Sequence, residues 1–210
     1  MIKQPIETSD EQYFPWYVKI FFWNQKRKYG AILEPARLWG RTPRVFAGLA
    51  MLYGALDRKA SPIEPALRSL ITVRVSQINW CSFCVDINSA TAINRHVGEE
   101  KLDDLTHFED SALYSDREKA ALAYAEAVTH TDQNTTEHHF ERLRSHFDDD
   151  AIIELTALIA FQNLSSKFNA SLAVAPQGFC KIAPMPAAKE KEGSANEREL
   201  RSKAKDIKGL

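Results

Sequence analysis

The sequence has few cysteines, almost no net charge and no long apolar run, and each absence excludes a class of protein. Three cysteines among 210 residues are too few for the disulfide scaffold of a small secreted domain. The formal net charge of -1 gives no support for a nucleic-acid partner. The most apolar stretch, residues 14–23, is too short to span a bilayer and contains Lys19. Because no apolar leader follows Met1, we expect a cytoplasmic protein with no membrane partner.

The remaining composition is typical of one globular domain with an appendage. Hydrophobic residues make up 44% of the chain, which is ordinary for a protein that buries a core. Pro184 and Pro186 prevent a helix from continuing, and after Lys181 the composition changes to lysine, arginine and glutamate. We therefore predict a helical domain over residues 1–183 and a charged, flexible tail over residues 184–210.

Apolar residues recur at helical spacing through most of the domain, so the fold class is predicted to be all-α. Proline after a capping threonine and serine three residues before glutamate are typical starts of helices. The predicted helices run from Thr42-Pro43 to Leu56, from Ile63 to Ile78, from the capping box 115–118 to Val128, from Thr136 to Phe147, and over residues 151–172. The only strand-like alternation, residues 73–76, lies inside a helical pattern.

Cys81-Ser82-Phe83-Cys84 is the motif that carries chemistry. C-x-x-C spacing allows a disulfide within one turn of chain, and it tends to lower the pKa of one thiol. The same spacing also occurs in redox enzymes, in half of a zinc site and in buried cores by chance. Zinc would need two further ligands, but Cys180 is distant and no histidine pair has finger spacing. No metal and no cofactor are therefore predicted.

The residues before the motif predict where its helix begins. Asn79 is a good N-cap residue, and the apolar period restarts at Val85. This places both cysteines in the first turn of a helix, where unpaired N–H groups and the helix dipole stabilise a thiolate. On this physical ground alone, Cys81 would be the more acidic thiol because it lies nearer the helix start.

The surrounding residues resemble those of a known family. Residues 67–84 (LRSLITVRVSQINWCSFC) are similar to the core of the carboxymuconolactone decarboxylase / alkyl hydroperoxide reductase D-like (AhpD-like) family. Residues 98–102 (GEEKL) and 117–125 (REKAALAYA) are similar to it as well, and the resemblance covers about residues 30–180. It implies an all-α fold, a homo-oligomer that is a trimer or hexamer, and, in thiol-bearing members, reduction of small-molecule peroxides at the expense of an external dithiol.

The resemblance also implies a role for each thiol. In these peroxidases the second cysteine attacks the peroxide and the first cysteine resolves the product. Carried over, Cys84 is the peroxidatic residue and Cys81 the resolving one. This assignment opposes the helix-dipole argument, and we follow it because neighbouring side chains can outweigh a helix end.

Two residues depart from the family pattern. The pattern has histidine four residues after the second cysteine and glutamate twelve before the first, where this sequence has Asn88 and Ser69. Neutral side chains cannot replace that proton relay, although Asn88 can hydrogen-bond a thiolate or a water and is a candidate catalytic residue. Asp86 is a further candidate, but a solvated acid at a helix start is the favoured interpretation. Glu64 and Glu118 are candidate substitute bases.

Three functions remain open from the sequence. The leading hypothesis is a thiol-dependent peroxidase or disulfide reductase. The second is a decarboxylase acting on a small lactone acid, although no dedicated arginine cluster is evident and Arg68 and Arg74 flank the motif in sequence only. The third is a non-enzymatic oligomeric redox sensor that has lost the relay.

Overall fold

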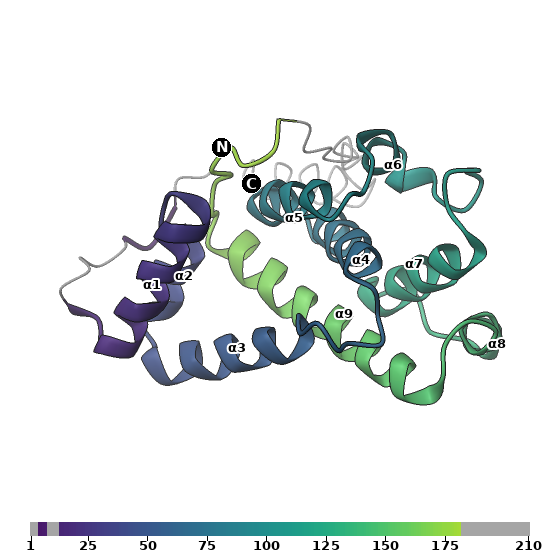
Figure 1. Cartoon of the computed structure of the whole chain (residues 1–210), viewed down its shortest axis with the longest axis horizontal. Coiled ribbons are helices and arrows are strands. Elements are labelled where there is room, and N and C mark those ends of the chain that lie inside the picture. The colour runs from purple at the N-terminus through teal and green to yellow at the C-terminus, as the bar shows by residue number, and fades with distance from the viewer. Residues whose placement is uncertain (1–3, 8–12, 182–210) are drawn as a thin grey trace, which may run out of the picture.

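A computed structural model describes residues 4–7 and 13–181 of the chain, and these residues form nine α-helices and no strand (Figure 1). The all-α prediction is confirmed. The predicted tail, residues 184–210, lies outside the described residues. The helices are α1 (Trp16–Tyr29), α2 (Glu34–Gly40), α3 (Pro43–Leu56), α4 (Pro65–Ile78), α5 (Ser82–Asn94), α6 (Glu99–Asp103), α7 (Asp116–Thr129), α8 (Glu137–Arg144) and α9 (Asp149–Ser171).

Helix α4 occupies the centre of the domain. It packs against α5, α7 and α9, so it has almost no face towards water. This explains the short strand-like alternation at residues 73–76. Val73 and Val75 are both fully buried, although they lie on different sides of the helix. A helix that is buried on all sides has no amphipathic period, so its sequence can be mistaken for that of a buried strand.

Local capping explains where the surrounding helices begin. Ser115 and Glu118 form the expected capping box at the start of α7. Asp148 caps α9 through a hydrogen bond of 2.8 Å from the N–H of Ala151 to its Oδ1 atom. Both helices then contribute apolar residues to the main core, which includes Leu122 and Leu155. No helix among residues 4–7 and 13–181 is both long enough and apolar enough to cross a bilayer.

The first three helices form a separate arm beside this core (Figure 1). Helices α1 and α2 both pack against α3 through a separate small cluster of aromatic and aliphatic side chains, which includes Phe14, Phe22 and Phe46. Helix α3 continues from this arm and reaches α9. Residues of this arm and of α4, α5 and α9 together line a cavity.

Candidate active site

The turn between α4 and α5 positions both cysteines. Helix α4 ends at Ile78, and Trp80 follows with a left-handed φ of 54°. The N–H of Cys81 then donates to the carbonyl of Ser76 across 3.1 Å, which closes a Schellman-type turn. Two residues are needed for this reversal, so the N-cap of α5 is Cys81 and not Asn79. The predicted cap was wrong by two residues.

The two cysteines form a disulfide at the start of α5, with their Cα atoms 5.2 Å apart. Cys81 stands just outside the helix, and its sulfur accepts a hydrogen bond of 3.2 Å from the N–H of Cys84. Both side chains are buried, in a small cluster with Leu38 of α2 and Val174 after α9. The prediction that C-x-x-C lies at a helix start is confirmed.

Asn169 of α9 contacts the second sulfur. Its Nδ2 atom donates a hydrogen bond of 3.2 Å to Cys84 Sγ. The residue is only 2% exposed, and its Oδ1 atom is buried with no hydrogen-bond partner. Sequence reasoning missed Asn169. Its signal was a polar stripe in an apolar helix, because Gln162, Ser166 and Asn169 repeat at helical spacing and are all buried.

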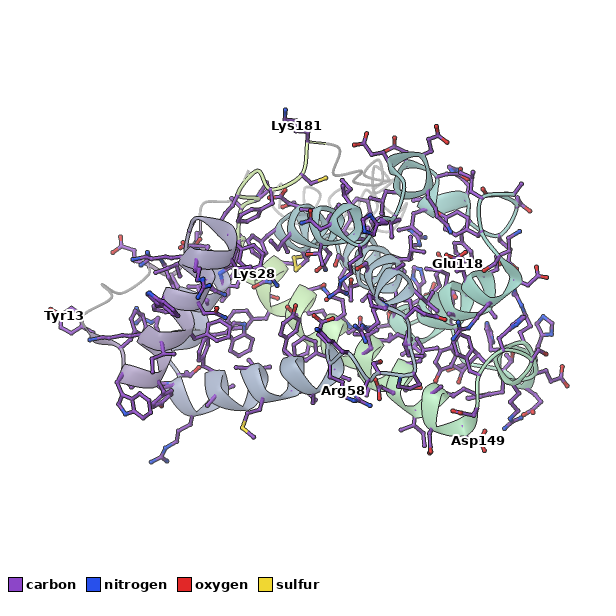
Figure 2. All side chains as sticks on the ribbon, in the orientation of Figure 1. Tyr13, Lys28, Arg58, Glu118, Asp149 and Lys181 are labelled. Carbon is purple, nitrogen blue, oxygen red and sulfur yellow. A yellow bond between two sulfur atoms is a disulfide. The ribbon has the colours of Figure 1, made fainter. Side chains whose placement is uncertain are left out.

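A cavity of about 430 Å³ adjoins the disulfide. It lies between the arm of α1, α2 and α3 on one side and α4, α5 and α9 on the other, and one of its lining residues, Lys28, is labelled in Figure 2. Cys84 belongs to its wall, whereas Cys81 does not. Most of the wall is apolar or aromatic, with rings from Phe21, Trp39 and Phe161 among others. Trp39 is held in place by stacking on Phe168, with the ring centroids 3.6 Å apart.

One face of α5 forms a side of this cavity. The residues on it repeat at helical spacing and are Cys84, Ile87, Asn88, Thr91 and Arg95. Arg95 donates to both carboxylate oxygens of Asp57 across 2.7 and 2.8 Å, and to Ser69 Oγ across 3.3 Å. Arg68 also contacts Asp57, with 3.4 Å between Nη2 and Oδ1. Sequence reasoning missed Asp57 and Arg95, although Arg95 shares a helical face with Cys84.

The structure brings Ser69 and Asn88 to the same cavity as Cys84. Asn88 Nδ2 donates to Ser76 Oγ across 3.1 Å and lies 3.4 Å from the carbonyl oxygen of Thr72. Ser69 is buried and accepts from Arg95. The two positions where the family pattern has glutamate and histidine thus line one wall, but both groups are neutral here.

Asp86 is not the solvated acid that the sequence suggested. It is 1% exposed and does not line the cavity. Its Oδ2 atom accepts from the N–H groups of Gln177 and Gly178 across 2.8 and 2.7 Å, and its Oδ1 atom accepts from Cys180 N–H across 2.7 Å. The segment after α9 crosses α5 here, and its backbone donors need a buried partner. Asp86 therefore anchors that segment.

Neither substitute base suggested by the sequence reaches the cavity. Glu64 forms an ion pair with Arg117, and Glu118 binds Lys101 across 2.6 Å while it caps α7. Burial acts to raise the pKa of Glu118, but the hydrogen bonds from Lys101 and Ser115 outweigh it and hold that pKa below its usual value. Among the described residues that line the cavity, Asp57 is the only carboxylate.

Tyr53 of α3 faces this charged end of the cavity. Burial among the walls raises the pKa of its hydroxyl above the usual value, and the negative charge of Asp57 adds to the effect. The residue nevertheless keeps 44% of its surface accessible to solvent. Its hydroxyl therefore stays protonated and can donate a hydrogen bond. In the part of the chain that the structure describes, no group of three or more metal-ligating side chains comes together.

Comparison with known proteins agrees with this geometry. The family model described as "Carboxymuconolactone decarboxylase family" matches residues 43–127, from the start of α3 to near the end of α7. An uncharacterized protein of Escherichia coli (strain K12), YnjA, is 43% identical over 160 residues, which are 76% of this chain and 88% of that protein. The chain belongs to the carboxymuconolactone decarboxylase family. The matched segment contains both cysteines of the disulfide, so the predicted family is confirmed.

Solved structures of similar shape support the fold. An AhpD-core, uncharacterized peroxidase-related protein of Ralstonia eutropha JMP134 superposes with a TM-score of 0.77 at 22% identity, covering 87% of this chain and 97% of that one. The debrominase Bmp8 superposes with a TM-score of 0.74 at 22% identity, covering 84% and 94%. At 22% identity these structures establish that the chain has the AhpD core fold, and they do not establish its reaction.

Proposed function

We propose that this protein is a thiol-dependent peroxidase or disulfide reductase in which Cys84 meets the substrate and Cys81 resolves the oxidised product. The observation that carries the proposal is the asymmetry of the pair. The two cysteines are close enough to bond, yet Cys84 alone belongs to the wall of the cavity. A substrate in that cavity reaches Cys84 first, which agrees with the roles that the family resemblance implies.

The proposed cycle has three balanced steps. The Cys84 thiolate attacks one oxygen of a hydroperoxide, the O–O bond breaks, and the leaving oxygen takes a proton to give an alcohol and a sulfenic acid. The Cys81 thiol then attacks that sulfur, which forms the disulfide and releases water. An external dithiol reduces the disulfide through a mixed disulfide and is itself oxidised. The described disulfide corresponds to the state before this last step.

Among the described residues that line the cavity, no histidine or glutamate stands ready to protonate the leaving oxygen as the family relay would. Ser69 and Asn88 occupy the relay positions and are neutral. Asp57 is the one carboxylate among the described lining residues, but two arginines contact it. We therefore expect turnover that is slow compared with a peroxidase that has the complete relay.

The known proteins support the proposal at the level of the fold. One neighbour is described as peroxidase-related, and the debrominase Bmp8 has been solved with 2,3,4-tribromopyrrole. Tribromopyrrole, which was bound to a cysteine-to-alanine variant of Bmp8, is an aromatic molecule. An organic substrate in the aromatic cavity of this protein is consistent with both.

The decarboxylase alternative gains one observation from the structure. Arg74 turns away from the cavity to pair with Glu126 across 2.5 Å, but Arg68 and Arg95 both line the cavity. Two guanidinium groups suit an acidic ligand. Decarboxylation of a small lactone acid would make no use of the disulfide, so activity that survives loss of Cys84 would favour this alternative.

We also propose that the protein assembles as a homo-oligomer, a trimer or hexamer. Large apolar side chains on α1 lie in water in a single chain, including Trp16, Ile20 and Trp23. Exposed apolar groups gathered on one element are typical of interfaces. Light scattering of the purified protein measures the mass, and a monomer would contradict the proposal.

The proposed function is tested by peroxide consumption in the presence of a small dithiol, followed by mass spectrometry of the protein after one equivalent of peroxide. We expect consumption that requires the dithiol, and a Cys81–Cys84 disulfide as the product. Substitution of Ser for Cys84 is the matched control. Consumption that persists without Cys84, or oxidation at Cys180 instead, would overturn the proposal.

A further inference from the structure

The cavity beside Cys84 is much larger than hydrogen peroxide requires. Its volume of about 430 Å³ is in the range of sites that bind organic molecules, roughly 300–1,000 Å³. The composition also matches such sites, because the walls are mostly aromatic and aliphatic and include a small cluster of charged groups. The cavity therefore has room for a substrate that carries an organic group as well as the reacting oxygen atoms.

The ion-paired cluster of Arg68, Arg95 and Asp57 lies away from the sulfur, while the polar side chains nearer to it, such as Asn88, are neutral. Cys84 lies in the first turn of α5 and Arg95 directly follows its last residue, eleven positions later. At 1.5 Å per residue this separates their backbones by roughly 16 Å along one helical face. Between them the wall presents Ile87, Asn88 and Thr91, none of which is charged. A ligand that reaches both ends is elongated, with its reactive group at one end and its polar group at the other.

The far end carries positive charge. Arg68 and Arg95 share a single carboxylate, that of Asp57, so the cluster has one more positive charge than negative. The side chains of Arg95 and Asp57 are 22% and 24% exposed, which leaves their charges within reach of a ligand. Tyr53 offers its hydroxyl as a hydrogen-bond donor at the same end.

We propose that the cavity binds an elongated amphipathic organic hydroperoxide, with an anionic group near Arg95 and Tyr53, an aromatic or branched apolar body against the α1–α3 arm, and the hydroperoxide beside Cys84. The product alcohol would keep the anionic group. The reaction rests on the proposed function, but the binding of an amphipathic anion does not depend on it.

The binding test compares two ligands that differ in charge and little else. Para-isopropylbenzoate and para-isopropylbenzamide are titrated by calorimetry into the full-length, disulfide-bonded protein. A single unpaired positive charge near the ligand predicts that the carboxylate binds about tenfold more tightly than the amide. Equal affinity, or tighter binding of the amide, would overturn the proposal.

Two variants change the preference in opposite directions. Arg95→Gln removes a cation and should reduce the preference for the carboxylate to within about twofold. Asp57→Asn removes the only carboxylate of the described wall and should increase it. Both variants break the same ion pair, so a purely structural effect would weaken both ligands alike in both proteins. Arg142→Gln, on α8 and away from the cavity, is the control and should leave the preference unchanged.

A kinetic comparison separates this inference from the proposed function. Cumene hydroperoxide and its para-carboxylate have the same reacting group, and we expect kcat/KM to be about tenfold higher for the carboxylate. Turnover of both peroxides at equal kcat/KM would overturn the proposal that the substrate is an anion, and the proposed peroxidase activity would stand. Preferential binding of the benzoate with no turnover of either peroxide would overturn the proposed function and leave the ligand class.

Discussion

The side-chain amide of Asn169, near the end of α9, donates a hydrogen bond of 3.2 Å to Cys84 Sγ, 85 residues earlier in the chain. A donor of this kind favours the charged form of sulfur and thereby lowers the pKa of the reduced thiol. The unpartnered Oδ1 atom of the same amide gives it a second function. It can accept from the S–H or sulfenic O–H group that appears when the disulfide is reduced and reoxidised.

Replacing Asn169 by leucine should therefore raise the pKa of the Cys84 thiol by about one unit, since a hydrogen bond to a charged group contributes about 1.5 kcal/mol or more. The measurement is the pH dependence of alkylation of Cys84 in the Cys81→Ser background. Asn163→Leu is the matched control, because this amide on the same helix binds Asn79 and Thr129 instead of sulfur. Equal alkylation pKa values for the two variants would contradict the role of Asn169.

The two cysteines should differ when each is replaced by serine. Cys84→Ser should abolish peroxide consumption, whereas Cys81→Ser should accumulate a sulfenic acid or mixed disulfide on Cys84, detected by trapping and mass spectrometry. In the wild type, mild peroxide should remove two thiols together and spare Cys180. The reverse pattern would mean that Cys81, as the N-cap of α5, is the attacking thiol.

Restoring the family relay should accelerate the reaction. General acid–base groups typically contribute about 10²–10⁴-fold, so Ser69→Glu combined with Asn88→His should raise peroxide reduction by at least about tenfold. The two changes should help more together than separately. Ser69→Gln with Asn88→His is the control for size without charge. A fast wild type that the double change does not improve would point to Asp57 as the group that serves the site.

Asp86→Asn should destabilise the segment after α9. An asparagine can accept with one oxygen only and turns an NH₂ group towards backbone donors, which costs about 2–3 kcal/mol. Limited proteolysis should then cut near Gln177 in the variant before the domain unfolds. Asp103→Asn, an exposed acid on α6, is the control. Unchanged cleavage would show that other contacts hold the segment.

Trp80→Gly should stabilise the oxidised protein. The left-handed conformation costs a non-glycine residue roughly 1–2 kcal/mol, and Trp80 is 48% exposed, so little burial is lost. Part of the gain is offset by the greater freedom of glycine in the unfolded chain, leaving about 0.5–1 kcal/mol in denaturant unfolding. Trp80→Ala removes the ring but keeps the strained backbone, and should give no gain. Equal stability of both variants would contradict this explanation.

The sequence predicted the parts of the fold that depend on local pattern. The helices that begin at Pro43, Asp116 and Glu137 have capping residues or a proline that any reader can find, and their apolar period is regular. Helix α1 was missed because its N-cap, Pro15, forms no side-chain cap, and because the helix is rich in aromatic residues, which have low helix propensity. Helix α2, only seven residues long, was missed as well.

The candidate site was predictable only near the cysteines. Ser69 and Asn88 could be located because the family pattern fixes their spacing from the motif. Asn169, Asp57 and Arg95 join the site through packing of α9, α3 and α5, and no local pattern specifies which polar residue of a buried helix will meet a sulfur. The interpretation of Asp86 as a solvated acid was wrong for the same reason, since its hydrogen-bond partners lie about 90 residues away in the sequence.

The cavity draws its walls from two kinds of chain segment. The matched family segment, residues 43–127, supplies Cys84, Asn88 and Arg95, while α1, α2 and α9 supply most of the aromatic rings of the wall. Cys84 and the two groups proposed to hold the anion, Arg95 and Tyr53, thus lie in one stretch of the chain, whereas most of the rings proposed to contact the apolar body lie outside it. On both proposals, changes in Phe21 or Phe161 should alter which apolar bodies the cavity accepts, while Cys84 and Arg95 keep their places.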